Sequence, residues 1–252
     1  MKPISANIPI NSTVNKIAAG QEKISSGNKI NSAKDDAAGL QISNKLLTQL
    51  NSLENQSRNA NDALSYYQVA DAGLSGVQDA AQRINELSIQ AANSTLGSSE
   101  RQAIQQEIQG LQEQVGTIAS ETEFAGQAVF GNSNNTLSNT IALDADAVIN
   151  AISEIDVTTS AGAQQAIEQS GAVLEQIGAG RTSIGALQNQ LLSDIEVQQS
   201  GRQANSQSYS RIKDTDMAAE VSEQVKNKMQ LEAMLALKAQ GNLEAGLLQK
   251  LL

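Results

Sequence analysis

The sequence lacks several residue types on which most enzymes and metalloproteins depend. Among its 252 residues there is no Cys, no His and no Trp, and only 2% of the residues are aromatic. Without Cys or His, the chain can form no disulfide, no Cys- or His-ligated zinc site and no Cys- or His-dependent nucleophile. It contains no Gly-rich phosphate loop of the required form, and no carboxylate pair is flanked by aromatic residues that would tune acid–base chemistry. We therefore expect a protein that is not an enzyme and that binds no metal or cofactor.

Proline and positive charge are also scarce. Both prolines, Pro3 and Pro9, precede Ile10, so the rest of the chain is free of the strongest helix breaker. The formal net charge of −10 is opposite in sign to a nucleic-acid-binding face. No apolar run approaches the roughly 18 residues of a membrane span, and residues 1–10 lack the apolar segment of a signal peptide. We expect no nucleic-acid partner, no membrane span and no export through a cleaved signal peptide.

Apolar residues at helical spacing mark both ends of the chain. Near the start they fall four and three apart, with Gln21 in the same register, as in a coiled-coil seam: Ile10, Val14, Ile17 and Ile24. Near the end, Met217, Val221, Val225 and Met229 are four apart, and leucines close the chain: Leu243, Leu247, Leu248, Leu251 and Leu252. Because chain termini are usually polar and frayed, we expect these two ends to pair and then to be covered by further copies of the chain.

Three more apolar patterns lie between the ends. A long seam runs in steps of three and four from Leu46 to Leu87 and contains Gly73 and Gly76, where we expect another backbone to come close. A second face spans 103–118 and follows a capping-box pattern, Ser99 with Gln102. A third spans 163–195 and is separated from the closing helix by the polar stretch 198–210.

The centre of the chain has a different character. Residues 124–158 are rich in turn formers, with short β-leaning pieces at 129–130 and 140–143. One or two hairpins fit this otherwise non-helical region. The expected fold is mainly α: an elongated antiparallel helical bundle or coiled coil with a small β-hairpin region in the middle.

Five motifs, in the same order and at compatible spacing, resemble bacterial flagellin, the subunit of the flagellar filament. They are INSAKDDAAGL at 30–40, SRNAND at 57–62, QRINELSIQAAN at 82–93, TEFAGQ at 122–127 and SRIKDTDMA at 210–218. The resemblance implies terminal helices at 1–35 and 211–252 that form the inner, polymerisation domain. It implies a rod-like helical core domain at 36–130 and 161–210, and a short surface-exposed hairpin or loop at 131–160.

The resemblance also assigns roles to particular residues. The apolar residues of both ends match residues that take part in polymerisation, except for Met217 and Met229, which are not included. Lys34, Asp35 and Asp36 match a spoke or subunit contact, with local helix capping as the alternative. Arg83, Leu87 and Glu107 match the surface by which a vertebrate Toll-like receptor recognises some flagellins, with a merely solvated helix face as the alternative.

The implied function is a structural subunit that polymerises with copies of itself into the extracellular filament of the bacterial flagellum, for motility. The implied partners are other copies of the chain, an export chaperone, and cap and junction proteins. The stretch before Ile30 is shorter than is usual in the family, which leaves a hook–filament junction protein as an alternative. A ligand or adhesin acting on host cells is another alternative, and a soluble helical tether is one outside the family.

Overall fold

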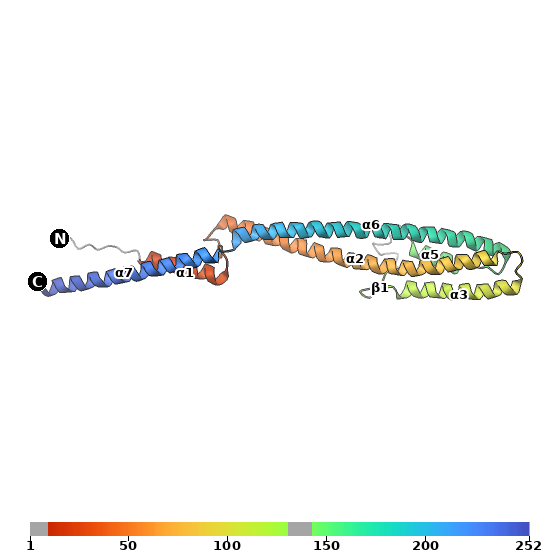
Figure 1. Cartoon of the computed structure of the whole chain (residues 1–252), viewed down its shortest axis with the longest axis horizontal. Coiled ribbons are helices and arrows are strands. Elements are labelled where there is room, and N and C mark those ends of the chain that lie inside the picture. The colour runs from red at the N-terminus through yellow and green to blue at the C-terminus, as the bar shows by residue number, and fades with distance from the viewer. Residues whose placement is uncertain (1–9, 131–142, 252) are drawn as a thin grey trace. The chain divides into compact units, whose positions relative to one another are not determined.

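The structure, a computed structural model, describes residues 10–130 and 143–251, and for residues 244–251 it describes the backbone alone. The elements, in chain order, are α1 (Ile10–Ser26), α2 (Ala37–Ala91), α3 (Ser98–Glu121), β1 (Glu123–Phe124), β2 (Gln127–Ala128), α5 (Ala145–Ser153), α6 (Ser160–Lys213) and α7 (Met217–Leu251). The chain divides into two compact units, residues 1–54 with 200–252 and residues 55–199. The predicted mainly-α fold with a small β-hairpin region is confirmed (Figure 1).

The core of the 55–199 unit lies where α2, α3 and α6 meet. The seam predicted on α2 is confirmed, because its members between Ala60 and Leu87 are mostly buried. The facing residues come from α3 and α6, whose predicted apolar faces also point inward. The largest fully buried side chains in these three helices are Ile84, Ile108, Val115, Val173, Ile177 and Ile184.

Gly73 and Gly76 leave room for side chains, not for a second backbone as the sequence suggested. A Cβ at Gly73 would lie 2.6 Å from Cε2 of Phe130, and one at Gly76 would lie 3.1 Å from Cδ1 of Ile118. Both neighbours belong to the segment that packs across α2. The glycines are therefore explained by close packing against an aromatic ring and an isoleucine.

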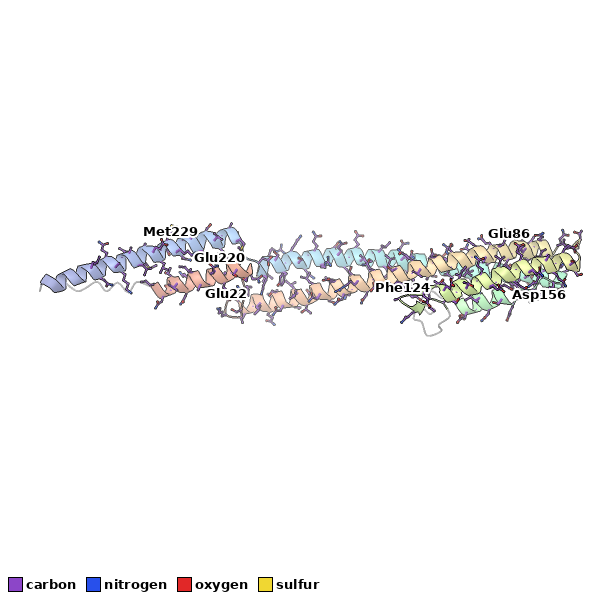
Figure 2. All side chains as sticks on the ribbon, turned by 90° about the horizontal axis from the view of Figure 1, so that it is seen from below. Glu22, Glu86, Phe124, Asp156, Glu220 and Met229 are labelled. Carbon is purple, nitrogen blue, oxygen red and sulfur yellow. The ribbon has the colours of Figure 1, made fainter. Side chains whose placement is uncertain are left out.

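The hairpin lies slightly earlier than expected. β1 and β2 pair antiparallel around Ala125 and Gly126, whose φ angles of 52° and 77° give the turn its left-handed backbone. The ring of Phe124, which is labelled in Figure 2, packs edge-on against Tyr66 of α2, with centroids 5.6 Å apart, and this contact attaches the hairpin to the core. The β-leaning piece predicted at 129–130 lies outside the strands, and most of the piece at 140–143 lies outside the described residues.

The expectation of a non-helical centre is wrong for α5. Asp144 caps this helix by accepting a hydrogen bond from the amide of Ala147 (3.0 Å), and Val148 and Ile152 are buried in the core. The spacing of four between Val148 and Ile152 places these β-branched residues on one helical face. This part of the 131–160 range therefore packs into the core and is not a surface loop.

Two helix boundaries also differ from the prediction. α3 is capped by Gly97 without a side-chain hydrogen bond, so the predicted capping box at Ser99 is wrong. The turn between α2 and α3 is instead held by Arg101, whose guanidinium donates to the carbonyls of Ala91 (2.9 Å) and Asn93 (3.1 Å). α6 continues through the polar stretch 198–210 and ends only at Lys213, so the predicted separation there is also wrong.

Candidate functional site

The contact between α1 and α7 involves mainly polar and small residues. These helices pack side by side in the unit of residues 1–54 and 200–252 (Figure 1). On α7 the buried residues are Gln224 and Asn227, and on α1 they are Thr13 and Gly20. Nε2 of Gln224 donates a hydrogen bond of 2.5 Å to Oε1 of Gln21. Three isoleucines of α1 alternate with Thr13 and Gly20 at spacings of three and four, so they lie on the same face and are half-buried there: Ile10, Ile17 and Ile24. The seam within one molecule therefore combines a hydrogen bond between amides, close approach and partly buried isoleucines.

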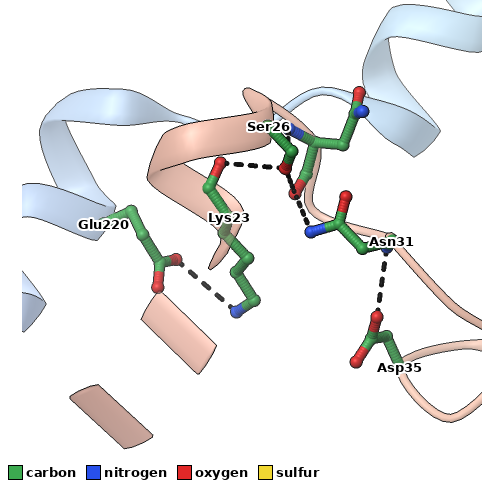
Figure 3. Close-up of polar contacts among 6 residues, drawn as sticks. Lys23, Ser26, Asn31, Asp35 and Glu220 are labelled. Carbon is green, nitrogen blue, oxygen red and sulfur yellow. Dashed lines mark hydrogen bonds and ion pairs between the residues drawn. The ribbon is translucent and has the colours of Figure 1, made fainter. Parts of the chain in front are cut away.

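A glycine and an ion pair lie where the two helices meet. A Cβ at Gly20 would lie 3.2 Å from Oε1 of Glu220, so a larger residue there would displace this carboxylate by a few tenths of an ångström. Glu220 also pairs with Lys23 of α1, with 3.6 Å between its Oε2 and Nζ (Figure 3). Both side chains are partly shielded from water. This shielding strengthens the pair relative to a fully exposed one.

Several apolar residues of α7 point away from this contact, although Leu231 and Met234 are half-buried on the face of Gln224 and Asn227. Because α7 turns by about 100° per residue, Val221 and Val225 are displaced around the helix from the inward-facing Glu220 and Gln224. The exposed fractions are 43% for Met217, 42% for Val221, 49% for Val225 and 58% for Met229, and we call these four residues the α7 stripe. Figure 2 shows Met229 directed away from α1.

Other apolar side chains of the two helices are exposed in the same way. The fractions are 45% for Val14 on α1, and 48%, 62% and 70% for Leu235, Leu237 and Leu243 on α7. The side chains of Leu247, Leu248 and Leu251, and the whole of Leu252, lie outside the described part of the chain. A concentration of exposed apolar residues of this kind marks an interaction surface.

Backbone hydrogen bonds join the two connections at the base of this helix pair. Gly27, with φ of 70°, ends α1 and donates to the carbonyl of Lys23 (2.9 Å). The amide of Lys29 donates to the carbonyl of Lys213 (2.7 Å), and the amide of Thr215 donates to the carbonyl of Gly27 (2.9 Å). The exit of α1 and the entry to α7 are therefore fixed to each other, which sets the register of the pair.

Asp35 and Asp36 make local contacts ahead of α2. Oδ1 of Asp36 accepts from the amide of Gly39 (2.8 Å), which is helix capping. Oδ2 of Asp35 accepts from the amides of Ser32 (2.9 Å) and Asn31 (3.1 Å), the second contact being drawn in Figure 3. The hydrogen bonds from Ser32, and then the one from Asn31, hold the pKa of Asp35 below its usual value. The exposed Lys34 pairs loosely with Glu22, at 3.9 Å. The predicted subunit contact here stays a prediction.

The three predicted receptor residues differ in accessibility. Nη2 of Arg83 lies 2.7 Å from Oε1 of Glu107, and Arg83 also reaches Glu86 at 3.1 Å (Figure 2 labels Glu86). The hydrogen bonds that Arg83 donates to Glu107 are the main cause of the raised pKa of Arg83. Leu87 is only 2% exposed and lies in the core. The structure thus brings Arg83 and Glu107 together on the surface and buries Leu87 beneath it.

Several important residues did not stand out in the sequence. Gln224 and Asn227, three apart, carry the α1–α7 seam although an apolar search passes over them. On α3, Nε2 of Gln112 donates to the carbonyl of Ile152 (2.8 Å), and Oε1 of Gln105 accepts from the amide of Val157 (2.8 Å). Gln105 and Gln112 are seven residues apart and so lie on one helix face, and this spacing is the only sequence signal that could have identified them.

Over residues 10–130 and 143–251, no helix has both the length and the apolar character needed to cross a membrane. In the same part of the chain, no three acidic side chains are grouped as metal ligands would be.

Comparison with known proteins gives matches over nearly the whole chain. Residues 3–135 match the bacterial flagellin N-terminal helical region, and residues 165–252 match the bacterial flagellin C-terminal helical region. A flagellin of Halalkalibacterium halodurans is 32% identical over 249 residues, which cover 94% of this chain and 91% of that protein. Flagellin A of Vibrio anguillarum is 44% identical over 124 residues, which are 49% of this chain but only 33% of the longer Vibrio protein.

Among solved structures, a Bacillus cereus flagellin aligns with a TM-score of 0.48 and 23% identity, covering 56% of this chain and 88% of that one. We draw nothing from a likeness at that level. The family models and the Halalkalibacterium relative are sufficient by themselves. This chain belongs to the bacterial flagellins, the structural subunits of the flagellar filament.

Proposed function

We propose that this flagellin polymerises by burying the α7 stripe, together with Val14, against neighbouring copies in the filament. The observation that supports the proposal is that polar and apolar residues occupy different faces of α7. Gln224 and Asn227 face α1 within the molecule, whereas Val221 and Val225 face outward with more than two fifths of their surface exposed. In an isolated molecule the apolar stripe is exposed to water, which is unfavourable, whereas packing in a helical polymer would bury it.

The energy available from the stripe is substantial but insufficient alone. Full burial of a Val or Met side chain contributes roughly 1.5–3 kcal/mol, so covering four half-exposed ones contributes on the order of 3–6 kcal/mol. Association costs about 4–15 kcal/mol in lost freedom. The contact therefore needs additional surface, and Leu235, Leu237 and Leu243 of the same helix supply it. We include the remaining closing leucines, Leu247, Leu248, Leu251 and Leu252, on the sequence argument.

The wider assignment follows from this contact. A head-to-tail interface that does not close on itself generates a helical filament. We assign residues 1–35 and 211–252 to the inner polymerisation domain and the rest, including α5, to the core and surface parts. The proposed setting is extracellular, with an export chaperone and cap and junction proteins as partners. We propose no catalytic role, and neither the junction protein nor the host ligand is favoured over the filament subunit.

The test is a charge placed on the stripe. Val225→Asp should raise the concentration needed for polymerisation by on the order of a hundredfold, because a buried unpaired carboxylate is strongly disfavoured. Purified chains are mixed with filament seeds and scored by sedimentation and electron microscopy. Gln230→Asp is the matched control, since Gln230 is an exposed polar residue of the same helix, five positions further on. Equal polymerisation by the two variants, with both helical by circular dichroism, would remove the proposed contact.

A further inference from the structure

The oxidisable side chains of this chain are concentrated in α7. The sequence has four Met and no Cys, His or Trp, so methionine sulfur is the main target that a mild oxidant could reach. Met1 lies outside the described residues, and the other three, Met217, Met229 and Met234, all belong to α7. Met234 is half-buried, whereas Met217 is 43% exposed and Met229 is 58% exposed.

The two exposed methionines occupy the two ends of the α7 stripe. Val221 and Val225 lie between them at spacings of four. Neither methionine takes part in the polar seam formed by Gln224 and Asn227. Leucine or valine would serve an apolar contact equally well at these positions. The methionines therefore bring to the stripe one property that an aliphatic residue lacks, a sulfur open to solvent in the free molecule.

We propose that Met217 and Met229 are modification sites at which a peroxide converts the thioether to a sulfoxide and so blocks polymerisation of the free subunit. This inference rests on the proposed function of the α7 stripe. In the reaction the sulfur lone pair attacks one peroxide oxygen, a sulfur–oxygen bond forms and the oxygen–oxygen bond breaks. With hydrogen peroxide, one oxygen is transferred to the sulfur and the other leaves as water. The sulfur is thereby oxidised by two electrons and the peroxide is reduced by two.

The product has properties opposite to those that the stripe requires. A sulfoxide is polar and accepts hydrogen bonds, and it would enter an apolar contact without a donor to meet it. The free molecule tolerates the change because both side chains already face water. Oxidation thus leaves the folded subunit intact and removes its ability to join neighbours. In a formed filament the same sulfurs are covered and should be protected.

The experiment exposes monomer to hydrogen peroxide, removes the peroxide and seeds polymerisation. Mass spectrometry locates the added oxygen atoms, and sedimentation measures polymer. We expect oxygen at Met217 and Met229 first and a rise of roughly tenfold in the concentration needed to polymerise for each oxidised position. Treatment with methionine sulfoxide reductases should restore polymerisation. The double variant Met217→Leu with Met229→Leu should polymerise before and after peroxide, while Met234→Leu should remain sensitive.

Several results would overturn the proposal. Undiminished polymerisation by chain that carries oxygen at both sites would do so, as would a loss that reductase does not reverse or that the double variant shares. The Val225→Asp variant separates the two proposals. If that variant fails to polymerise while oxidised chain succeeds, only the oxidation proposal falls. If it polymerises like Gln230→Asp, the stripe is not the contact and both proposals fall.

Discussion

At the scale of single residues, glycine marks the closest packing in the core. Gly73 lies under the ring of Phe130, where an added Cβ would come within 2.6 Å. A Cβ added at Gly110 on α3 would have no neighbouring atom within 4 Å. Both positions are helical, so a Gly→Ala substitution gains the same intrinsic helix preference at each. The difference between the two substitutions therefore measures the cost of crowding at Gly73.

Gly73→Ala should therefore destabilise the 55–199 unit by about 1–3 kcal/mol, because the ring must move. Gly110→Ala should stabilise it by about 0.5–1 kcal/mol, because alanine is the better helix former. Chemical unfolding followed by circular dichroism measures both. A stabilising Gly73→Ala would contradict the close contact between Gly73 and Phe130.

Asp35 gives a pH dependence whose sign follows from its hydrogen bonds. The backbone amide and hydroxyl of Ser32 lower its pKa below the ordinary value of 3.8. A lowered pKa in the folded state means that the carboxylate stabilises the fold above the ordinary value. This contribution is lost as the pH falls through the folded value. Asp35→Asn should flatten the acid limb of stability against pH, and NMR titration of Asp35 should give a midpoint below 3.8. A midpoint at or above the ordinary value would contradict these hydrogen bonds.

The sequence predicted part of this detail. Placing the two aspartates at a helix start was correct for Asp36, since capping residues have a strong local signature. The sequence placed Leu87 both in the apolar seam of α2 and among the predicted receptor residues on the surface. The structure shows that Leu87 is buried, which agrees with the seam. The polar seam residues Gln224 and Asn227 went unnoticed because hydrophobic periodicity is blind to a contact made by amides.

At the scale of elements, α3 holds α5 through glutamine side chains. Gln112 donates to the carbonyls of Ile152 and Ile155, at 2.8 and 3.1 Å, just where α5 ends. Each carbonyl has a second, longer hydrogen bond, from the amide of Ile155 to Ile152 (3.3 Å) and from Nε2 of Gln105 to Ile155 (3.4 Å). Gln112 therefore supplies the shorter of the two hydrogen bonds that each carbonyl accepts. The hydrogen bond of Gln105 to the amide of Val157 extends the same attachment.

Gln112→Leu should cost the 55–199 unit about 0.5–1.5 kcal/mol, because the carbonyls of Ile152 and Ile155 lose the shorter of their hydrogen bonds. It should also accelerate hydrogen exchange in α5 more than in α2. The control is Gln114→Leu, an exposed position on the same helix. Equal effects of the two variants would show that the attachment adds nothing.

Element boundaries were predicted best where the pattern was long. The seam of α2 and the break between α2 and α3 follow from apolar steps of three and four and from turn residues. α5 was missed because nine residues are too few to distinguish a helix from β-leaning sequence. The continuity of α6 through its polar stretch was missed because helix propensity, and not apolar periodicity, carries that segment.

At the scale of the whole molecule, the family and the mainly-α fold were predicted from motifs and composition, whereas the facing of α1 and α7 was not. The sequence suggested that the apolar stripes of the two ends would meet each other. In the structure the α7 stripe and Val14 are exposed, whereas Ile10, Ile17 and Ile24 of α1 are half-buried. Polar contacts also join the ends, namely the hydrogen bond between Gln224 and Gln21 and the pair Lys23–Glu220. In the proposed polymer, one face of α7 packs against α1 within the molecule and the α7 stripe meets neighbouring copies.

The most direct test of this account is the accessibility of position 225 before and after assembly. The natural chain has no Cys, so Val225→Cys introduces a single thiol that reports on the α7 stripe alone. Its rate of maleimide labelling is measured in monomer and in seeded polymer, and each is compared with unfolded chain. The account predicts rapid labelling of the monomer and strong protection in the polymer. Labelling at the same rate in both would contradict it.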